Sequence, residues 1–115
     1  MAIVQHLTID QNSTFDAEVT ILTEDKFYFD LTNYTAYATM RKSPTSTYSV
    51  DFTCTIPTPT YGNVVLSLSD EETRAIPAGR YMYDVIVENS EGEKYRAIEG
   101  IITVNAGITV GSVAP

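Results

Sequence analysis

Asp84 and Glu99 are the two carboxylates in this sequence that could do acid and base chemistry together, because each interrupts an otherwise apolar β-hairpin. Two facing carboxylates can divide the roles of general acid and general base when they share a cleft. The alternative is that Asp84 faces solvent or pairs with Arg96 across the hairpin, and we favour this alternative. We therefore expect no enzyme, and a small acid–base enzyme is the third of three functional hypotheses.

Two patterns that resemble metal sites fail on inspection. The segment "DQNSTFD" (residues 10–16) spaces oxygen-bearing side chains like the first four ligands of an EF-hand calcium loop. Phe15 stands at the position that requires glycine and Ile21 at that of the bidentate glutamate, so we interpret the segment as a polar turn before a strand. His6 is the only histidine, and a zinc site around it would need carboxylates for nearly all its ligands. We expect neither a metal nor a cofactor.

Cys54 is the only cysteine, which excludes an intrachain disulfide and a multi-cysteine metal site. As a nucleophile it would need a base such as His6 beside it. It occupies instead an apolar position of its strand, where cysteine usually packs as a small hydrophobe. We therefore expect a buried, unreactive thiol.

Composition predicts one all-β domain over residues 1–115. A chain of 115 residues can bury a substantial core, and 43% of its residues are apolar. Eight tyrosines, no tryptophan and many Thr, Val and Ile residues favour strands over helices. We expect residues 105–115 to form an edge strand or a flexible tail.

The charge balance excludes two classes of partner. Fifteen acidic and seven basic residues give a net charge of −8, which repels nucleic acid and anionic membrane surfaces. No stretch approaches the ~18 consecutive apolar residues of a membrane span. We expect a soluble product of the cytoplasm, or of a particle that is assembled there.

Alternating apolar positions predict seven or eight short strands with turns every 8 to 12 residues. The strongest strand prediction covers residues 47–57, where every second residue from Tyr48 to Ile56 is apolar or cysteine. The segment 81–87 is almost continuously apolar, which predicts a central strand covered on much of both faces. Its return strand, residues 94–104, places Arg96 on the same face as Ile98.

One short helix and one tyrosine refine the architecture. Ser69 and Glu72 match a capping box, which predicts a helical turn over residues 70–76. Tyr81 follows this turn like the corner tyrosine of immunoglobulin-like sandwiches, with its hydroxyl bonded back to the chain, and Tyr83 stands where antibody domains carry their second cysteine. We predict an immunoglobulin-like, two-sheet antiparallel β-sandwich with one short helical turn.

Tyr34 and Tyr37 are the candidate ligand or partner surface. Exposed aromatic rings could form a platform on which sugars stack, although strand tyrosines are commonly structural. If these rings are exposed and clustered, the chain would be a carbohydrate-binding or adhesive sandwich module. This is the second functional hypothesis.

The segments "DLTNYTAYATMRKS" (30–43), "LSLSDEETRAIPAGRYMYDVIV" (66–87) and "YRAIEGIITV" (95–104) carry a resemblance to a known family. This is a resemblance to small virion proteins of tailed phages, especially marine T4-like phages, and to phage baseplate and tail-fibre domains, and it provides the first functional hypothesis. It spans about residues 14–110, implies a non-enzymatic β-sandwich subunit and carries over no catalytic residue. The implied location is the virion, assembled in the host cytoplasm, at the capsid surface, neck, baseplate or tail. The implied partners are other virion proteins and further copies of the chain.

Overall fold

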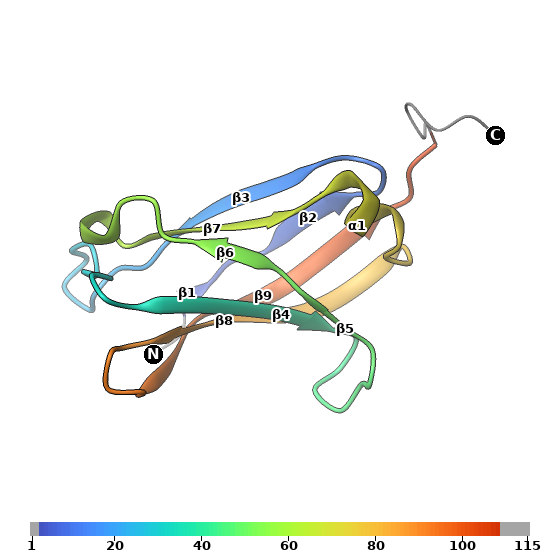
Figure 1. The fold of residues 1–115 in the computed structure, drawn as a ribbon. Coiled ribbons are helices and arrows are strands. Elements are labelled where there is room, and N and C mark those ends of the chain that lie inside the picture. The colour runs from blue at the N-terminus through green and yellow to red at the C-terminus, as the bar shows by residue number, and fades with distance from the viewer. Residues whose placement is uncertain (1–2, 109–115) are drawn as a thin grey trace.

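The chain folds into two packed β-sheets with one short α-helix (Figure 1). The structure, a computed structural model, describes residues 3–108. The large sheet has the order β1-β9-β8-β4-β5, with β2 also paired to β9, and the small sheet has the order β3-β7-β6. The elements are β1 (Ile3–Val4), β2 (Leu7–Asp10), β3 (Phe15–Thr20), β4 (Thr35–Arg41), β5 (Ser49–Asp51), β6 (Thr53–Thr55), a 3-10 turn η1 (Pro59–Tyr61), β7 (Asn63–Leu68), α1 (Asp70–Arg74), β8 (Gly79–Glu88) and β9 (Lys94–Asn105).

This strand order is that of an immunoglobulin-like sandwich, which confirms the predicted fold class. Strands β4, β5, β8 and β9 form one sheet, and β3, β6 and β7 form the other. The first two strands depart from the predicted antiparallel arrangement, because β1 and β2 run parallel to β9. Nearly the whole domain separates them from β9 in sequence, so no tight hairpin forces an antiparallel pairing.

The core lies between the inner faces of the two sheets. Ala36, Ala38 and Met40 of β4 point inward and are buried, as their alternation predicts. The two small side chains allow close approach of the segment between β5 and β6, where the Phe52 N–H donates a 3.0 Å hydrogen bond to the Ala38 carbonyl. The largest fully buried side chains are Tyr81, Ile9, Leu31, Met40, Leu66, Ile76, Ile98, Ile102, Val19, Val64, Val85 and Val87.

The single strand predicted for residues 47–57 is wrong. The structure contains two short strands in different sheets: β5 pairs with β4, and β6 pairs with β7. Phe52 lies buried at the crossing, whereas Tyr48 is 42% exposed. The alternation continues through the crossing because the inner faces of both sheets point into one core. A period of two therefore reveals the buried face without revealing the pairing partner.

Strand β8 is central in its sheet, between β4 and β9, but only one of its faces is covered. Tyr81, Tyr83, Val85 and Val87 are buried, whereas Met82 on the opposite face is 48% exposed. The expectation of cover on both faces is wrong, because the outer face of the large sheet carries no second layer in the described residues 3–108.

A β-bulge changes the predicted face of Arg96. Ile98 lies opposite Val85 and Arg96 lies opposite Ile86, so Ala97 is the extra residue on β9. Ala97 is buried and Arg96 is exposed, so Arg96 does not share the face of Ile98. A strict period of two cannot show such an insertion.

The helical turn and the corner tyrosine have the predicted contacts. The Glu72 N–H donates to Ser69 Oγ at 3.2 Å, and the Ser69 N–H donates to Glu72 Oε1 at 2.8 Å. Helix α1 ends at Arg74, two residues before the predicted end. The Tyr81 hydroxyl donates a 2.6 Å hydrogen bond to the Pro77 carbonyl, and the ring is 1% exposed. The last predicted strand or tail lies mainly outside the described residues.

Candidate functional site

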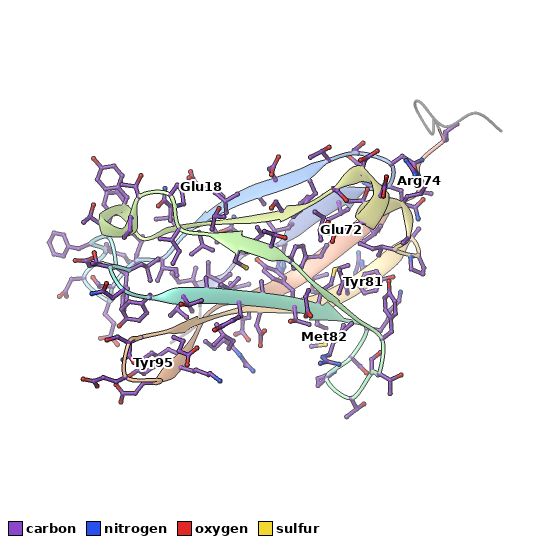
Figure 2. The ribbon with its side chains drawn as sticks, viewed as in Figure 1. Glu18, Glu72, Arg74, Tyr81, Met82 and Tyr95 are labelled. Carbon is purple, nitrogen blue, oxygen red and sulfur yellow. The ribbon has the colours of Figure 1, made fainter. Side chains whose placement is uncertain are left out.

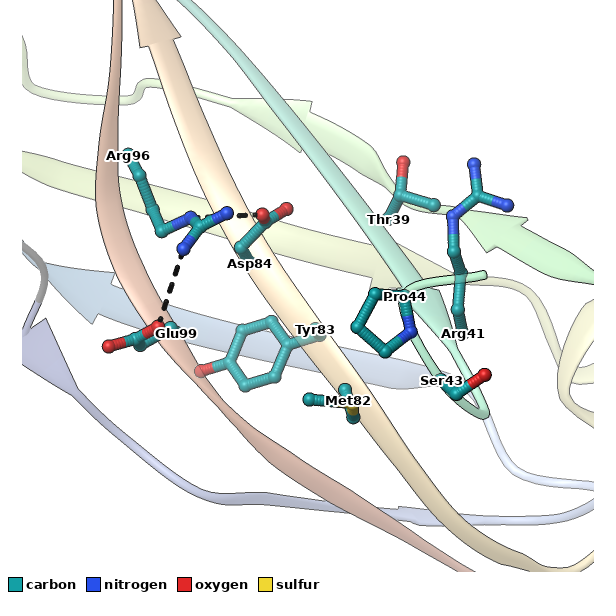
Figure 3. A pocket seen from close by; sticks show the side chains of 9 residues that line it. All are labelled: Thr39, Arg41, Ser43, Pro44, Met82, Tyr83, Asp84, Arg96 and Glu99. Atoms are coloured by element: carbon teal, nitrogen blue, oxygen red, sulfur yellow. Dashed lines mark ion pairs between the residues drawn. The ribbon is translucent and has the colours of Figure 1, made fainter. Parts of the chain in front are cut away.

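A shallow cleft on the outer face of the large sheet contains Asp84 and Glu99 (Figure 3). The two residues are direct cross-strand neighbours on β8 and β9, so the structure brings them together. The cleft has a volume of about 320 Å³. Its lining residues are Thr39, Arg41, Ser43, Pro44, Met82, Tyr83, Asp84, Arg96 and Glu99.

Arg96 binds both carboxylates of this cleft. Its Nε lies 3.2 Å from Asp84 Oδ2, and its Nη1 lies 3.7 Å from Glu99 Oε1. The predicted pairing of Asp84 with Arg96 is therefore present. The shared cleft that the enzyme hypothesis requires is also present, but the guanidinium already occupies an oxygen of each carboxylate. The arrangement is suited to offering charged hydrogen-bonding groups to a partner.

Tyr34 and Tyr37 do not form the predicted joint platform. Tyr37 is 48% exposed on the outer face of β4, and its hydroxyl donates a 3.0 Å hydrogen bond to Glu88 Oε1. This hydrogen bond with the carboxylate raises the pKa of Tyr37. Tyr34 is half-buried on the core side and packs edge-on against Phe29, with ring centroids 5.6 Å apart. Residues three apart in an extended chain point to opposite faces, which explains the separation.

Tyr34 instead lies with Tyr95 in a second pocket, at the end of the sandwich where β8 turns into β9. The loop between β3 and β4 covers this end, and Figure 2 shows Tyr95 at the tip of the hairpin. The pocket measures about 790 Å³ and is mainly apolar. Its lining residues are Ile3, Ile21, Leu22, Thr23, Glu24, Lys26, Phe29, Tyr34, Val87, Tyr95, Arg96 and Ala97.

Sequence reasoning missed Tyr95 because the hairpin brings it to Tyr34 across sixty residues of sequence. The charge of Glu93 raises the pKa of Tyr95. Aromatic rings beside Glu24 and Lys26 combine stacking surfaces with hydrogen-bonding groups, a composition typical of small-molecule pockets.

The structure shows the surroundings of the residues considered for metal binding or nucleophilic catalysis. Cys54 is half-buried on β6, and burial raises the pKa of its thiol to about 11. His6 is beside β9 in the other sheet, where its Nδ1 accepts a 3.1 Å hydrogen bond from the Ile101 N–H. Asp10 and Asn12 bind the side chains of Asn105 and Arg74. Within residues 3–108, no group of three His, Cys, Asp or Glu residues is arranged to hold a metal ion.

Helix α1 is too short to cross a membrane, and the described part of the chain contains no other α-helix.

Comparison with known proteins finds distant similarity to solved structures. No protein-family model matches the sequence, and no curated protein matches it. Among solved structures, the chain is similar to AggA, the major subunit of aggregative adherence fimbriae type I from Escherichia coli. The two chains are 11% identical, 89% of each is covered, and the TM-score is 0.43. This similarity is too distant to carry a functional argument.

Proposed function

We propose that the protein is a non-enzymatic structural component of a bacteriophage particle that acts through protein–protein contacts. The observation that carries this proposal is where the three phage-like segments lie. Residues 30–43 contain β4, residues 66–87 contain all of β8 except Glu88, and residues 95–104 lie within β9. These strands are consecutive neighbours in the large sheet, so segments far apart in sequence form one continuous surface.

The inner side of these three strands builds the core. Ala38, Tyr83 and Ile98 are buried there. Packing of the core therefore accounts for the inward residues of the three phage-like segments.

The outer side of the same strands is available for contacts. Tyr37, Met82 and Ile101 are 48%, 48% and 40% exposed on β4, β8 and β9. Large apolar side chains exposed on one face of a sheet are a feature of protein interaction sites. Arg96 holds Asp84 and Glu99 beside them in a fixed arrangement, which supplies polar partners for such an interface.

The direct test is to locate the protein in purified particles. Antibodies raised against the folded domain would be used for immunogold labelling of phage particles whose genome encodes this chain, with mass spectrometry of the same particles. We expect several copies per particle at one regular position. Absence from particles, with the protein abundant in infected cells, would contradict the proposal.

A carbohydrate-binding module is the second candidate. The observation that favours it is the pocket at the end of the sandwich where β8 turns into β9, here called the end pocket. Tyr34 and Tyr95 provide ring faces there, and Glu24 and Lys26 provide hydrogen-bonding groups. Glycan-array binding followed by calorimetry would test it. Binding that Tyr95→Ala abolishes would support this candidate, provided that Tyr61→Ala, which removes a 57% exposed ring outside the pocket, leaves binding unchanged.

A further inference from the structure

The outer β4–β8–β9 face differs from the rest of the surface in its charge. We define this face by the outward residues of the three strands, which are direct cross-strand neighbours. It has four basic and three acidic side chains, a net charge of +1, whereas the remaining residues include three basic and twelve acidic side chains, a net charge of −9. The charged members are Arg41, Arg80, Lys94, Arg96, Asp84, Glu88 and Glu99.

Apolar side chains lie on both sides of the charged centre of this face. Met82 is directly opposite Ile101, and Tyr37 is directly opposite Ile86. The row between these two pairs contains Asp84 and Glu99. Each apolar pair also has an arginine beside it, because Arg41 lies opposite Met82 and Arg96 lies opposite Ile86, so both signs of charge are present among the apolar side chains.

We propose that the outer β4–β8–β9 face binds the same face of a second copy of this chain in a two-fold symmetric dimer. The inference rests on the proposed role in assembly. Two chains of charge −8 repel each other, and contact between their acidic surfaces would increase that repulsion. Face-to-face pairing keeps the acidic surfaces of both copies on the outside of the dimer.

A two-fold axis makes this face complementary to itself. In such an interface the same patch is used on both copies, so each charge needs its opposite within the patch. Arg41 and Arg96 provide cations on either side of Asp84 in the cleft, and Glu99 adds a second carboxylate. Each copy can therefore offer both signs of charge to the other.

The outer face of the small sheet is a poorer candidate for the same contact. Its edge strand β3 directs Asp16 and Glu18 outward, and no basic residue lies on β3, β6 or β7. Figure 2 shows Glu18 on this side of the sandwich and Met82 on the side of the large sheet.

The size of the proposed face predicts a weak dimer. Five outward residues of β8 extend over about 27 Å, and the three strands together extend over about 14 Å. The resulting area of about 380 Å², before the projecting side chains are added, is about half of the roughly 800 Å² per partner of a standard interface.

Sedimentation velocity and light scattering over a concentration series of the full chain would test the proposal. We expect a dimer, and we expect the double variant Met82→Glu/Ile101→Glu to lower the association constant at least tenfold. The double variant Phe27→Glu/Tyr28→Glu is the matched control, because it adds the same charge at positions 70% and 58% exposed in the loop after β3 and should leave association unchanged.

Thr55→Glu distinguishes this dimer from head-to-tail stacking. Thr55 is exposed on the outer side of β6, which the proposed dimer leaves free. Unchanged association of this variant supports the face-to-face dimer. A loss comparable to that of the double variant would overturn it, because the small sheet would then take part in the contact.

Circular dichroism would show that each variant is folded. If the glutamates prevent folding, the milder double variant Met82→Thr/Ile101→Thr replaces them, and we expect it to weaken the dimer less. A wild-type monomer at about 0.5 mM would overturn this inference. Presence of the same protein in phage particles would still uphold the proposed function. A face-dependent dimer that is absent from particles would uphold the interface and contradict the phage role.

Discussion

The Tyr83 hydroxyl donates a 2.7 Å hydrogen bond to the backbone carbonyl of Gln5, which lies 78 residues earlier in the chain. Gln5 occupies the break between β1 and β2, so this bond joins the first strands to the centre of the large sheet. Tyr83 is 4% exposed. Tyr83 stands at the position where antibody domains carry their second cysteine. In this chain the phenol at that position holds the N-terminal segment.

This contact predicts a loss of stability at alkaline pH. Burial raises the pKa of Tyr83 from 10.0 to about 12. Between these values the folded chain keeps a proton that the unfolded chain has released, so the free energy of unfolding falls as the pH rises from 10 to about 12. Urea titrations at pH 9, 10 and 11 should show this decline. The free energy of unfolding of Tyr83→Phe should fall less steeply with pH than that of the wild type. Burial also raises the pKa values of Cys54 and Tyr81, so part of the slope should remain. Identical slopes for the variant and the wild type would exclude a contribution from Tyr83.

Gly100 should be required for the same junction. A Cβ atom at this position would overlap the Gln5 carbonyl and lie 3.0 Å from the Tyr83 ring. We expect Gly100→Ala to lower the free energy of unfolding by about 1–3 kcal/mol, as overpacking typically does. Hydrogen exchange should also accelerate in β1. Thr103→Ala, on the outer face of the same strand, is the control, and equal effects of the two variants would exclude a specific role for the close approach.

The sequence predicts those features that depend on neighbouring residues. The capping box joins Ser69 to Glu72, and the tyrosine corner joins Pro77 to Tyr81, so each is contained within five residues. Buried faces are predictable for the same reason, since alternation is local.

Features that depend on distant residues could not be predicted. The crossing at Phe52 keeps the alternation of a single strand, and the bulge at Ala97 reverses a face without any glycine or proline to mark it. Two elements distant in sequence meet in the end pocket, where Tyr34 and Tyr95 lie. Asp84 and Arg96 are the intermediate case, because the predicted hairpin placed them near each other and the bulge determined their actual register.

Cys54 should react slowly with thiol reagents in the folded protein. Its pKa of about 11 lies two units above the ordinary value of 9.0, so the thiolate population at pH 8 is about a hundredfold smaller. Labelling followed by mass spectrometry should therefore be much slower in buffer than in guanidinium chloride, where the chain is unfolded. Equal rates in the two solvents would show an open, reactive thiol.

Tyr81 should be among the most important single side chains for stability. Tyr81→Ala removes a fully buried ring and should cost about 3–5 kcal/mol. Tyr81→Phe keeps the ring, removes the hydrogen bond to the Pro77 carbonyl and should cost about 1 kcal/mol. Tyr37→Phe is the matched control, because it removes a hydroxyl whose bond to Glu88 is exposed to solvent, and it should cost less than about 0.5 kcal/mol. Chemical denaturation of the three variants would measure these costs. If Tyr81→Phe were no more destabilising than Tyr37→Phe, the ring alone would account for the corner, and the hydrogen bond would contribute nothing to the stability of the fold.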